Sequence, residues 1–521
     1  MKNSTISPGR SASSATSPTK PAAGAGGHGS QPSTGPIREH SLVLLFCLAA
    51  ALRLVLYAAA FPFFTIADEP EHLDLVIRYA QGDIPRAVGP LAAESLPYVA
   101  AYATPEYLNP PEQYRPPPWT QPADQAMTNM VRLEAAVSHW QNFEASQPPL
   151  YYALAGLWWR VGQALGFHDL LLLYLLRFLN APLLAATVCA GFIAARLVFP
   201  DSRFARLAVP ALLAFVPQSA FYGVQNDVLS PLVFGGLFIG AVRWLQAERP
   251  GIGLGVATGL ACAACYLTKI SNLPLVLVGL GALGLKCWRL GWQGKLRDAA
   301  PAMLAFVVCT LVPIGLWVAR TKHDFGDLTG SAAKMQVLGW TPKPFAEWWR
   351  HPIFTPRGAW IFLSGLLSTF WQEVFFWYAK PVKVPGVAVG YTLLSLGLLG
   401  VALWNLRKPA APARLREALS LAALAFGAGV AFFALLSIPF DFGPCIFPSR
   451  AHPYFTAGRL LAGAWIPFAL VFVYGWEQAL SRFNSRKLPA LAMAAFIVGL
   501  LLVEMAAAWP VFSSQYNLFH V

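Results

Sequence analysis

Long apolar stretches separated by short polar connections are the main pattern of this chain. Each holds about 20 predominantly apolar residues, enough for a helix to cross the roughly 30 Å hydrocarbon core of a bilayer. These stretches occupy residues 41–64, 170–198, 205–223, 227–246, 250–268, 271–287, 301–319, 385–405, 417–438, 459–478 and 488–508. The pattern therefore predicts an all-α polytopic membrane protein with a bundle of about 11 transmembrane helices.

Two further apolar stretches, 148–166 and 359–378, are ambiguous. Both carry several Trp and Tyr residues, which favour the headgroup level of a bilayer. If the first of them crossed on its own, the dense Lys and Arg clusters that follow would move to the outer side, against the positive-inside rule. We therefore expect both stretches to form interfacial helices at the outer face, within periplasmic loops.

The basic clusters also predict the topology. With the N-terminal tail in the cytoplasm, every dense cluster falls on the inner side; the clusters lie near residues 196–206, 243–249, 286–297, 407–416 and 482–487. Lys and Arg are enriched in cytoplasmic loops. We therefore expect a multi-pass protein of the bacterial inner (plasma) membrane, with a cytoplasmic N-terminus and an active site on the periplasmic side.

The domain organisation follows from the same reading. Residues 1–38 are rich in Ser, Pro, Gly, Ala and Thr and lack an apolar run, which predicts a disordered cytoplasmic tail. Residues 39–521 are expected to form one transmembrane domain. Its outer side holds a first periplasmic loop, 65–169, and a second, 320–384. The unusual polar residues of the chain gather in these loops and in the short outer connections.

Composition narrows the class further. Hydrophobic residues make up 56% of the chain and charged residues 12%, which excludes an ordinary soluble domain. The net charge of +13 is spread over short clusters without a basic face, so nucleic acid is not an expected partner. The seven cysteines lie mostly in apolar stretches and predict no disulfide framework; Cys262 and Cys265 favour small-residue helix packing.

The strongest local signal is the sequence Ala-Asp-Glu-Pro-Glu-His at residues 67–72, directly after the first span. Carboxylates and an imidazole this close to hydrocarbon usually face water, a partner or a site. A hydrated helix start is the alternative, with Asp68 as N-cap and Pro70 in the first turn. That alternative leaves Glu69 and His72 unexplained, so cap and site both stay open at this point.

Further polar residues stand at or inside apolar boundaries. Asn226 and Asp227 open one span, a position that a simple helix cap also explains. Lys269 lies between two spans, where it either reaches the headgroups or serves a site. Arg177 lies inside an apolar stretch and therefore requires a partner or an anion.

The last outer connection carries Arg450, His452 and Arg459. Such side chains bind a phosphate near the membrane surface, and ordinary lipid headgroups would satisfy them equally. The middle loop carries a polar, turn-rich segment at 320–330 without metal-ligand spacing, which predicts a solvated loop.

Taken together, these residues resemble the GT-C superfamily of membrane glycosyltransferases. The resemblance rests on Asp68-Glu69 directly after the first span, the Pro-Pro-Leu-Tyr-Tyr helix start at 148–152, the segment around Arg177 and the later Asn-Asp pair. The form Asp-Glu-Pro-x-His is similar to a poorly characterised bacterial branch. The resemblance covers roughly residues 41–330 and implies a GT-C-like bundle.

That resemblance implies a donor sugar on a polyprenyl phosphate in the bilayer and a periplasmic or lipid-linked acceptor glycan. By position it implies Asp68 as general base, with Glu69 beside it. The cations Lys269, Arg450 and Arg459 are then candidates to stabilise the donor phosphate. The remaining candidate site residues are His72, Arg177, Asn226, Asp227 and His452.

The expected reaction is a single displacement with one base, which would invert the anomeric centre. We expect the neighbouring carboxylate and partial burial to raise the pKa of the Asp68–Glu69 pair. In some branches of the superfamily the first-loop carboxylate binds a divalent cation. A metal stays open here, because ligands from one short segment fix no coordination geometry.

Two other functional classes stay open. One is a lipid or glycan transporter, although transporters often contain inverted repeats and no repeat is visible in the sequence. The other is a non-catalytic membrane subunit of a cell-envelope polysaccharide assembly system. No sequence feature excludes that second class.

Overall fold

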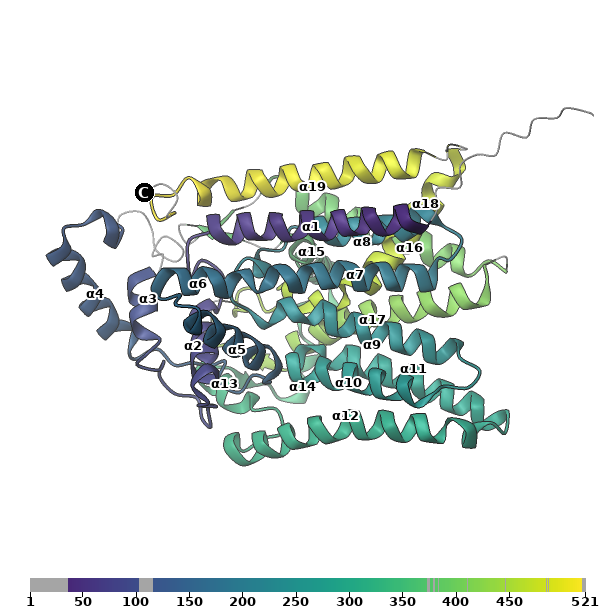
Figure 1. Cartoon of the computed structure of the whole chain (residues 1–521), viewed down its shortest axis with the longest axis horizontal. Coiled ribbons are helices and arrows are strands. Elements are labelled where there is room, and N and C mark those ends of the chain that lie inside the picture. Colours follow the sequence, from purple (N-terminus) through teal and green to yellow (C-terminus); the bar gives the residue numbers. More distant parts are fainter. Residues whose placement is uncertain are drawn as a thin grey trace, which may run out of the picture.

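The computed structural model describes residues 36–517, apart from 103–115, 373–374, 378–379, 383, 410, 446, 484 and 486. The predicted tail at residues 1–38 therefore lies almost wholly outside the described residues, as does part of the stretch 359–378. The described residues form mainly helices, which loops connect, together with four very short strands. The long helices run side by side, and several of the shorter helices gather at one end of the bundle (Figure 1).

The bundle is built from helices that run its length. They are α1 (Pro36–Ala60), α6 (Asp169–Phe178), α7 (Asn180–Val198), α8 (Arg203–Phe215), α9 (Ser230–Gln246), α10 (Ile252–Thr268), α11 (Leu273–Trp292), α12 (Leu296–Phe325), α16 (Val387–Leu406), α17 (Ala413–Ser437), α18 (Trp465–Leu480) and α19 (Leu488–Phe512).

Within the described ranges, nine helical segments are long and apolar enough to cross a membrane, and the shorter helix α10 accompanies them. Helix α6 and helix α7 together form one of these nine. The polytopic all-α prediction is therefore confirmed. The predicted span 205–223 differs in form, because its α-helix α8 has only 13 residues. It ends at Phe215 since the next residue, Val216, is extended ahead of a proline, which disfavours helical backbone.

The remaining elements lie mainly in the two long loops, and several short 3₁₀ helices form the ends of spanning segments. They are α2 (Glu69–Gln81), α3 (Leu96–Tyr102), α4 (Ala123–Val137), α5 (Leu150–Ala164), α13 (Ser331–Val337), α14 (Phe345–Trp348), α15 (Pro356–Trp371) and the 3₁₀ helices Pro118–Thr120, Ser219–Phe221, Asn226–Leu229, Ile270–Asn272, Pro352–Phe354, Gly458–Ala464 and Ser481–Phe483.

The strands form two small antiparallel pairs. β1 (Thr341–Pro342) pairs with β4 (Phe440–Asp441) and ties the middle loop to the connection after α17. β2 (Phe375–Trp377) pairs with β3 (Lys380–Val382) as a hairpin.

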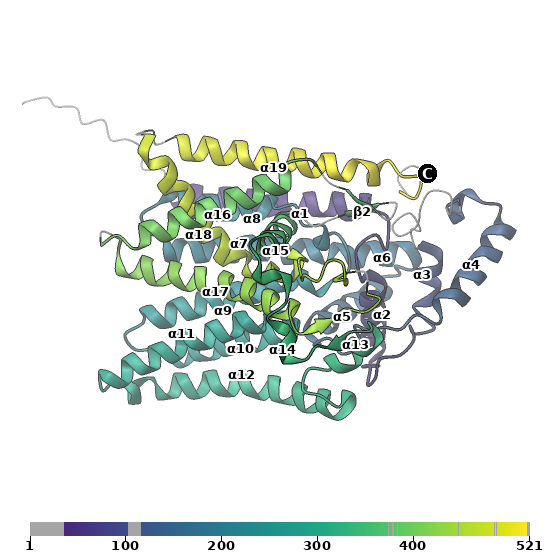
Figure 2. The same ribbon diagram turned by 180° about the vertical axis from the view of Figure 1, so that it is seen from behind.

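Both ambiguous apolar stretches are helices outside the nine long spans. The first is α5, which packs against α2. The second is α15, which packs against α16 and the 3₁₀ helix Gly458–Ala464 on the face seen in Figure 2. Its last residue, Trp371, contacts the rings of Phe468 and Phe472 on α18. Helix α15 therefore dips into the bundle at its C-terminal end.

Helix α10 packs against α12 through glycines rather than through metal-binding cysteines. A Cβ added at Gly255 would lie 2.1 Å from the carbonyl oxygen of Ala302, and one at Gly259 would lie 2.7 Å from that of Phe306. Small residues four positions apart let membrane helices approach closely. Cys262 lies fully buried on the same helix, in agreement with the predicted small-residue packing.

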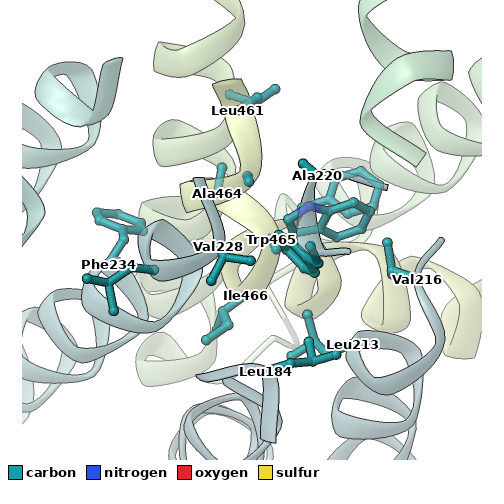
Figure 3. Close-up of a cluster of buried hydrophobic side chains, with 14 of the residues drawn as sticks. Leu184, Leu213, Val216, Ala220, Val228, Phe234, Leu461, Ala464, Trp465 and Ile466 are labelled. Atoms are coloured by element: carbon teal, nitrogen blue, oxygen red, sulfur yellow. The ribbon is translucent and has the colours of Figure 1, made fainter. Parts of the chain in front are cut away.

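Helix α18 is the most enclosed of the spans, with 83% of its apolar window buried, against 22% for α12. Figure 3 shows its Trp465 and Ile466 among apolar side chains of α7, α8 and α9. The Trp465 ring also stacks on Phe370 of α15, with centroids 4.0 Å apart. A helix held this firmly gives a fixed base to the residues just before it.

Candidate functional site

Asp68 stands where the first span gives way to helix α2. It occupies the N-cap position of α2 with φ 64° and ψ 10°, in the left-handed region that non-glycine residues rarely adopt. Its side chain makes no capping hydrogen bond. Such backbone costs of order 1–3 kcal/mol and persists where the surroundings hold it. Asp68 therefore stands at the N-cap position, but its carboxylate does not cap the helix and is available for another interaction.

The side chain of Asp68 pairs with Arg459. The Arg459 Nη2 donates to Asp68 Oδ2 over 2.6 Å, and Nη1 donates to the carbonyl oxygen of Ala67 over 3.2 Å. Arg459 belongs to the 3₁₀ helix that precedes the enclosed α18. The Asp68 side chain is 28% exposed and the Arg459 side chain 11%. The pair is therefore rigidly supported and still reachable.

Burial works against ionisation of Asp68, but the nearby positive charges of Arg459 and Lys334 outweigh it. They lower the pKa of Asp68 to about 2. The sequence-based expectation of a raised pKa is wrong for Asp68. The nearest charged group is a guanidinium, and an opposite charge stabilises the carboxylate.

Glu69 lies in a second, fully enclosed ion pair. Arg177 donates from Nε and Nη2 to the two Glu69 oxygens over 2.9 and 2.8 Å. The backbone amides of Phe64 and Val224 donate to the same carboxylate over 2.9 and 3.0 Å. Glu69 is 1% exposed and Arg177 is fully buried. The partner that Arg177 was expected to need is therefore Glu69. This pair leaves the Arg177 guanidinium enclosed and not available to a ligand.

Arg177 also ties down the end of the first span. Its guanidinium donates to the carbonyl oxygens of Ala58, Phe61 and Pro62 over 2.7–3.1 Å. These carbonyls lack helical partners because α1 ends at Ala60. The Glu69–Arg177 pair thus fixes the backbone that leads into Asp68.

Asp227 and Lys269 form a third pair. The Lys269 Nζ donates to Asp227 Oδ1 and Oδ2 over 2.6 and 2.7 Å, and both residues are buried. Two short 3₁₀ helices, Asn226–Leu229 and Ile270–Asn272, adjoin the pair. Burial lowers the pKa of Lys269, while Asp227 opposes that change.

Residues 225 and 226 connect this pair to the Asp68 region. The Gln225 Nε2 donates to the carbonyl oxygen of Ala67, the atom that Arg459 also contacts. The Asn226 Nδ2 donates to the Thr268 carbonyl oxygen over 3.2 Å. The structure therefore brings Asp68, Arg459, Asn226, Asp227 and Lys269 into one neighbourhood.

A fourth pair covers this neighbourhood and was not predicted. Lys334 of α13 pairs with Glu144 of the first loop, and the positive charge of Lys334 helps to lower the pKa of Asp68. The sequence predicted a solvated loop at residues 320–330, and it contains no local signal for Lys334. Only the fold brings the two long loops together.

Glu71 is a second group that sequence reasoning left without a role. It is 9% exposed, and burial, with the negative charge of Asp68, raises its pKa to about 8. Glu71 is therefore largely neutral at pH 7, one turn away from an aspartate that is ionised. Asp68 therefore lies beside positive charges that favour its ionised form, whereas Glu71 lies in a buried position that favours its neutral form.

His72 packs inward rather than toward solvent. Its Nδ1 lies 2.7 Å from the hydroxyl of Tyr152 on α5, and the residue is 1% exposed. Burial lowers the pKa of His72 to about 4, so the ring is neutral at pH 7. This contact joins α2 to the helix that begins with the Pro-Pro-Leu-Tyr-Tyr motif.

Arg450 and His452 lie apart from these pairs. Within the described part of the last outer loop, Arg450 donates from Nε to Asp441 Oδ1 over 2.8 Å rather than to Asp68, and its side chain is 70% exposed. The His452 ring contacts Phe447 and Tyr454. The structure thus brings Arg459 to Asp68 but leaves Arg450 at the surface.

The donor set does not fit a divalent cation. Among the residues that the structure describes, no group of three or more His, Cys, Asp or Glu side chains is placed to hold a metal ion. The groups that most strongly stabilise the Asp68 charge are the cations Arg459 and Lys334, whereas Mg²⁺ and Ca²⁺ prefer clustered oxygen ligands. No step is therefore assigned to a metal.

The sequence matches no protein-family model, and no curated protein matches it. Solved structures similar to the fold include the apo oligosaccharyltransferase of Archaeoglobus fulgidus, with a TM-score of 0.41 and 12% identity over 94% of this chain and 56% of that chain. Another is AglB of the same organism in complex with an inhibitory peptide and a dolichol-phosphate, with a TM-score of 0.38 and 12% identity over 92% and 55%.

A further similar structure is ArnT from Cupriavidus metallidurans bound to undecaprenyl phosphate, with a TM-score of 0.31 and 16% identity over 84% of this chain and 78% of that chain. The chain spans little more than half the length of the two archaeal structures. At this level of similarity, a function for this chain has to be argued from the arrangement of its own side chains.

Proposed function

We propose that the chain is a membrane glycosyltransferase that moves a sugar from a polyprenyl-phosphate donor to a periplasmic or lipid-linked acceptor glycan. The observation that carries this proposal is the Asp68–Arg459 pair. It joins a part-exposed, ionised carboxylate to a cation over 2.6 Å, on strained backbone at one end of a membrane bundle. Glycosyl transfer from a lipid phosphate needs both charges in one place.

The carboxylate serves the acceptor. As the acceptor oxygen attacks the anomeric carbon, its proton passes to the Asp68 carboxylate. The bond between the anomeric carbon and the phosphate oxygen breaks, and its electron pair stays on the phosphate. One displacement of this kind inverts the anomeric centre.

The cations serve the leaving phosphate. The main candidates are Lys269, which is buried, and Arg459, which is 11% exposed. Their positive charges oppose the negative charge that develops as the bond breaks. Arg450, across the same outer loop, is the third candidate from the sequence. A guanidinium can bind a phosphate through two parallel hydrogen bonds, which favours Arg459 as the main contact.

Binding of the donor would also change Asp68. With Arg459 beside it the pKa of Asp68 is about 2, which makes the carboxylate a weak base. A phosphate that draws the guanidinium away would remove the main stabilising charge and raise that pKa. Asp68 would then become a better proton acceptor only when the donor is bound.

We assign Glu69, Arg177 and His72 to positioning. Their hydrogen bonds hold the end of α1, the start of α2 and helix α5 in register. We also assign Asn226 and Asp227 to positioning of Lys269. Asp227 accepts hydrogen bonds from the Lys269 ammonium, and Asn226 donates to the carbonyl oxygen of the preceding residue, Thr268.

The site lies at the end of the bundle that carries α2, α5 and α13 (Figure 1). We assign this end to the periplasmic face of the bacterial inner membrane. The basic clusters of the chain, such as residues 286–297 and 407–416, lie in connections at the opposite end. Positive connections favour the cytoplasm.

The test compares membranes with and without the protein, and then an Asp68→Asn variant. Loss of the protein is expected to remove one surface glycan and to accumulate its lipid-linked sugar. That lipid then serves as the donor in membrane vesicles, where Asp68→Asn is expected to lower transfer by about 10²–10⁴-fold. Asn is among the residues that tolerate left-handed backbone, so the amount of inserted protein should not change.

A matched control is Asp83→Asn, which alters an exposed carboxylate of the same loop that pairs with Arg78. This control is expected to keep normal transfer. Unchanged glycans and transfer in the Asp68→Asn variant would contradict the proposal. That result would favour the transporter or the non-catalytic assembly subunit.

A further inference from the structure

A groove runs along the outside of the bundle between α11 and α17, away from Asp68. It has a volume of about 930 Å³ and is lined mainly by apolar side chains of these two helices and the end of α9. Leu277 and Leu424 on its walls are 58% and 59% exposed. An apolar groove on the lateral face of a membrane bundle is open to lipid chains.

The groove follows most of helix α11. It extends from Pro274 to Arg289, and fifteen helical steps correspond to about 22 Å. A lipid chain that enters at the Arg289 end therefore contacts apolar side chains along the groove.

One end of the groove is basic. Arg289, Arg414 and Arg416 line it together with Glu417, and Glu417 pairs with Arg289. This leaves a net positive charge at the mouth. Since α11 begins next to Lys269, Arg289 lies at the end of the bundle opposite the candidate active site. A basic pocket between membrane helices binds anionic headgroups.

A second cavity lies on the other side of Arg416. It has a volume of about 330 Å³ and is lined by Leu403, Leu406 and Arg407 of α16, with Arg416 and Ser420 of α17. Arg416 and Ser420 line both cavities. Arg407 and Arg416 add positive charge to this cavity, so it extends the basic mouth of the groove. Because the mouth lies at the end of the bundle opposite Asp68, it favours an anionic phospholipid over the polyprenyl-phosphate donor, whose phosphate is proposed to lie beside Arg459.

We infer that this surface binds an anionic glycerophospholipid, with its phosphate at Arg289, Arg414 and Arg416 and an acyl chain in the groove between α11 and α17. The site is separate from the proposed glycosyl transfer and does not depend on it. Bound there, the lipid joins α11 and α17 at the end of the bundle far from Asp68.

The experiment uses the full-length protein in phosphatidylcholine vesicles containing a trace of phosphatidylglycerol with a photoactivatable acyl chain. After illumination, labelled peptides are mapped, and unlabelled lipids compete for the label. Labelling is expected on α11 and α17, with stronger competition by phosphatidylglycerol than by phosphatidylcholine. Each arginine removed is expected to weaken the apparent affinity by about fivefold, so the triple change Arg289→Gln, Arg414→Gln, Arg416→Gln weakens it on the order of a hundredfold.

Two further variants keep the test independent of folding. The corresponding triple Arg→Lys variant keeps the charge and is expected to keep most of the affinity. Changing Arg243, Arg249 and Arg297 to Gln removes three arginines outside the groove and is expected to leave labelling unchanged. Equal competition by phosphatidylcholine, equal labelling of the triple Gln variant, or competition by undecaprenyl phosphate as strong as by phosphatidylglycerol would overturn the inference.

Discussion

Asp68 and Glu69 are neighbours in the chain, yet they lie in two different kinds of ion pair. Glu69 accepts hydrogen bonds from Arg177 and from two backbone amides, and both partners of its pair are buried. Asp68 makes one side-chain pair, with Arg459, and is 28% exposed. The Glu69 pair is fully enclosed by the protein, whereas the Asp68 pair is part-exposed.

The comparison shows how one short motif can separate support from chemistry. A buried charge pair is tolerated only when hydrogen bonds satisfy its remaining positions, and Glu69 meets that condition. A second enclosed pair, Arg53 with Glu504, joins α1 to α19 in the same complete way. Asp68 instead combines strained backbone, partial exposure and surrounding cations, a combination that is typical of functional sites.

The largest expected effect is on stability, from Glu69→Gln. The amide cannot neutralise Arg177, which would keep an uncompensated buried charge, so the free energy of unfolding should fall by about 3–5 kcal/mol. Denaturation of the detergent-solubilised protein and its amount in membranes measure this. Asp68→Asn is the matched comparison: it should lose transfer but lose less stability than Glu69→Gln, because the Asp68 pair is part-exposed. Equal stability losses in both variants would remove the distinction between the two pairs.

The next effect is on transfer, from Arg459→Gln. Loss of one cation at the leaving phosphate is expected to slow transfer by about 10²-fold, whereas Arg459→Lys should keep part of the rate. The pKa of Asp68, lowered to about 2 beside Arg459, should rise in the Gln variant. Its rate should therefore fall at a higher pH than that of the wild type during acidification. Identical pH profiles would contradict the pairing.

The same pair predicts a stability effect with a defined sign. Because the folded pKa of Asp68 is lowered from 3.8 to about 2, the pair stabilises the fold above pH 3.8. That contribution is lost as the pH falls toward 2. Arg459→Gln should reduce this loss, which acid titration followed by a tryptophan fluorescence change would measure.

A smaller, pH-dependent effect is expected from Glu71→Gln. The folded pKa of about 8 lies above the ordinary value of 4.5, so the folded protein keeps a proton that the unfolded chain releases. Stability should therefore fall as the pH rises from about 4.5 to 8 in the wild type. The Gln variant lacks this dependence. Thermal unfolding at pH 5 and pH 8 compares the two, and parallel changes would contradict a buried, neutral Glu71.

The smallest effect is expected from Arg450→Gln. The pair with Asp441 is exposed on the outer loop, and surface ion pairs contribute little and are screened by salt. Unfolding should be unchanged, and the apparent KM for the lipid donor should rise less than in Arg459→Gln. A loss of transfer as large as that of Arg459→Gln would move the phosphate site outward along this loop.

The sequence by itself determined the class of this protein and the position of its main motif. Apolar stretches of spanning length predict membrane helices because hydrophobicity and length are local properties of the chain. For the same reason the two aromatic stretches were correctly predicted as additional helices, and residues 67–72 could be singled out next to the first span. The break after α8 also has a local cause, in the proline that follows Val216.

Only the tertiary structure decided which acidic side chain pairs with which basic side chain. Glu69 pairs with a residue 108 positions away, and Asp68 with one 391 positions away. Lys334 reaches Glu144 across two separate loops. An ion pair depends on separations of a few ångströms between side chains, and spacing along the chain does not encode such distances between distant helices. The pKa of Asp68 was therefore expected to rise, and folding reversed its direction by bringing Arg459 beside it.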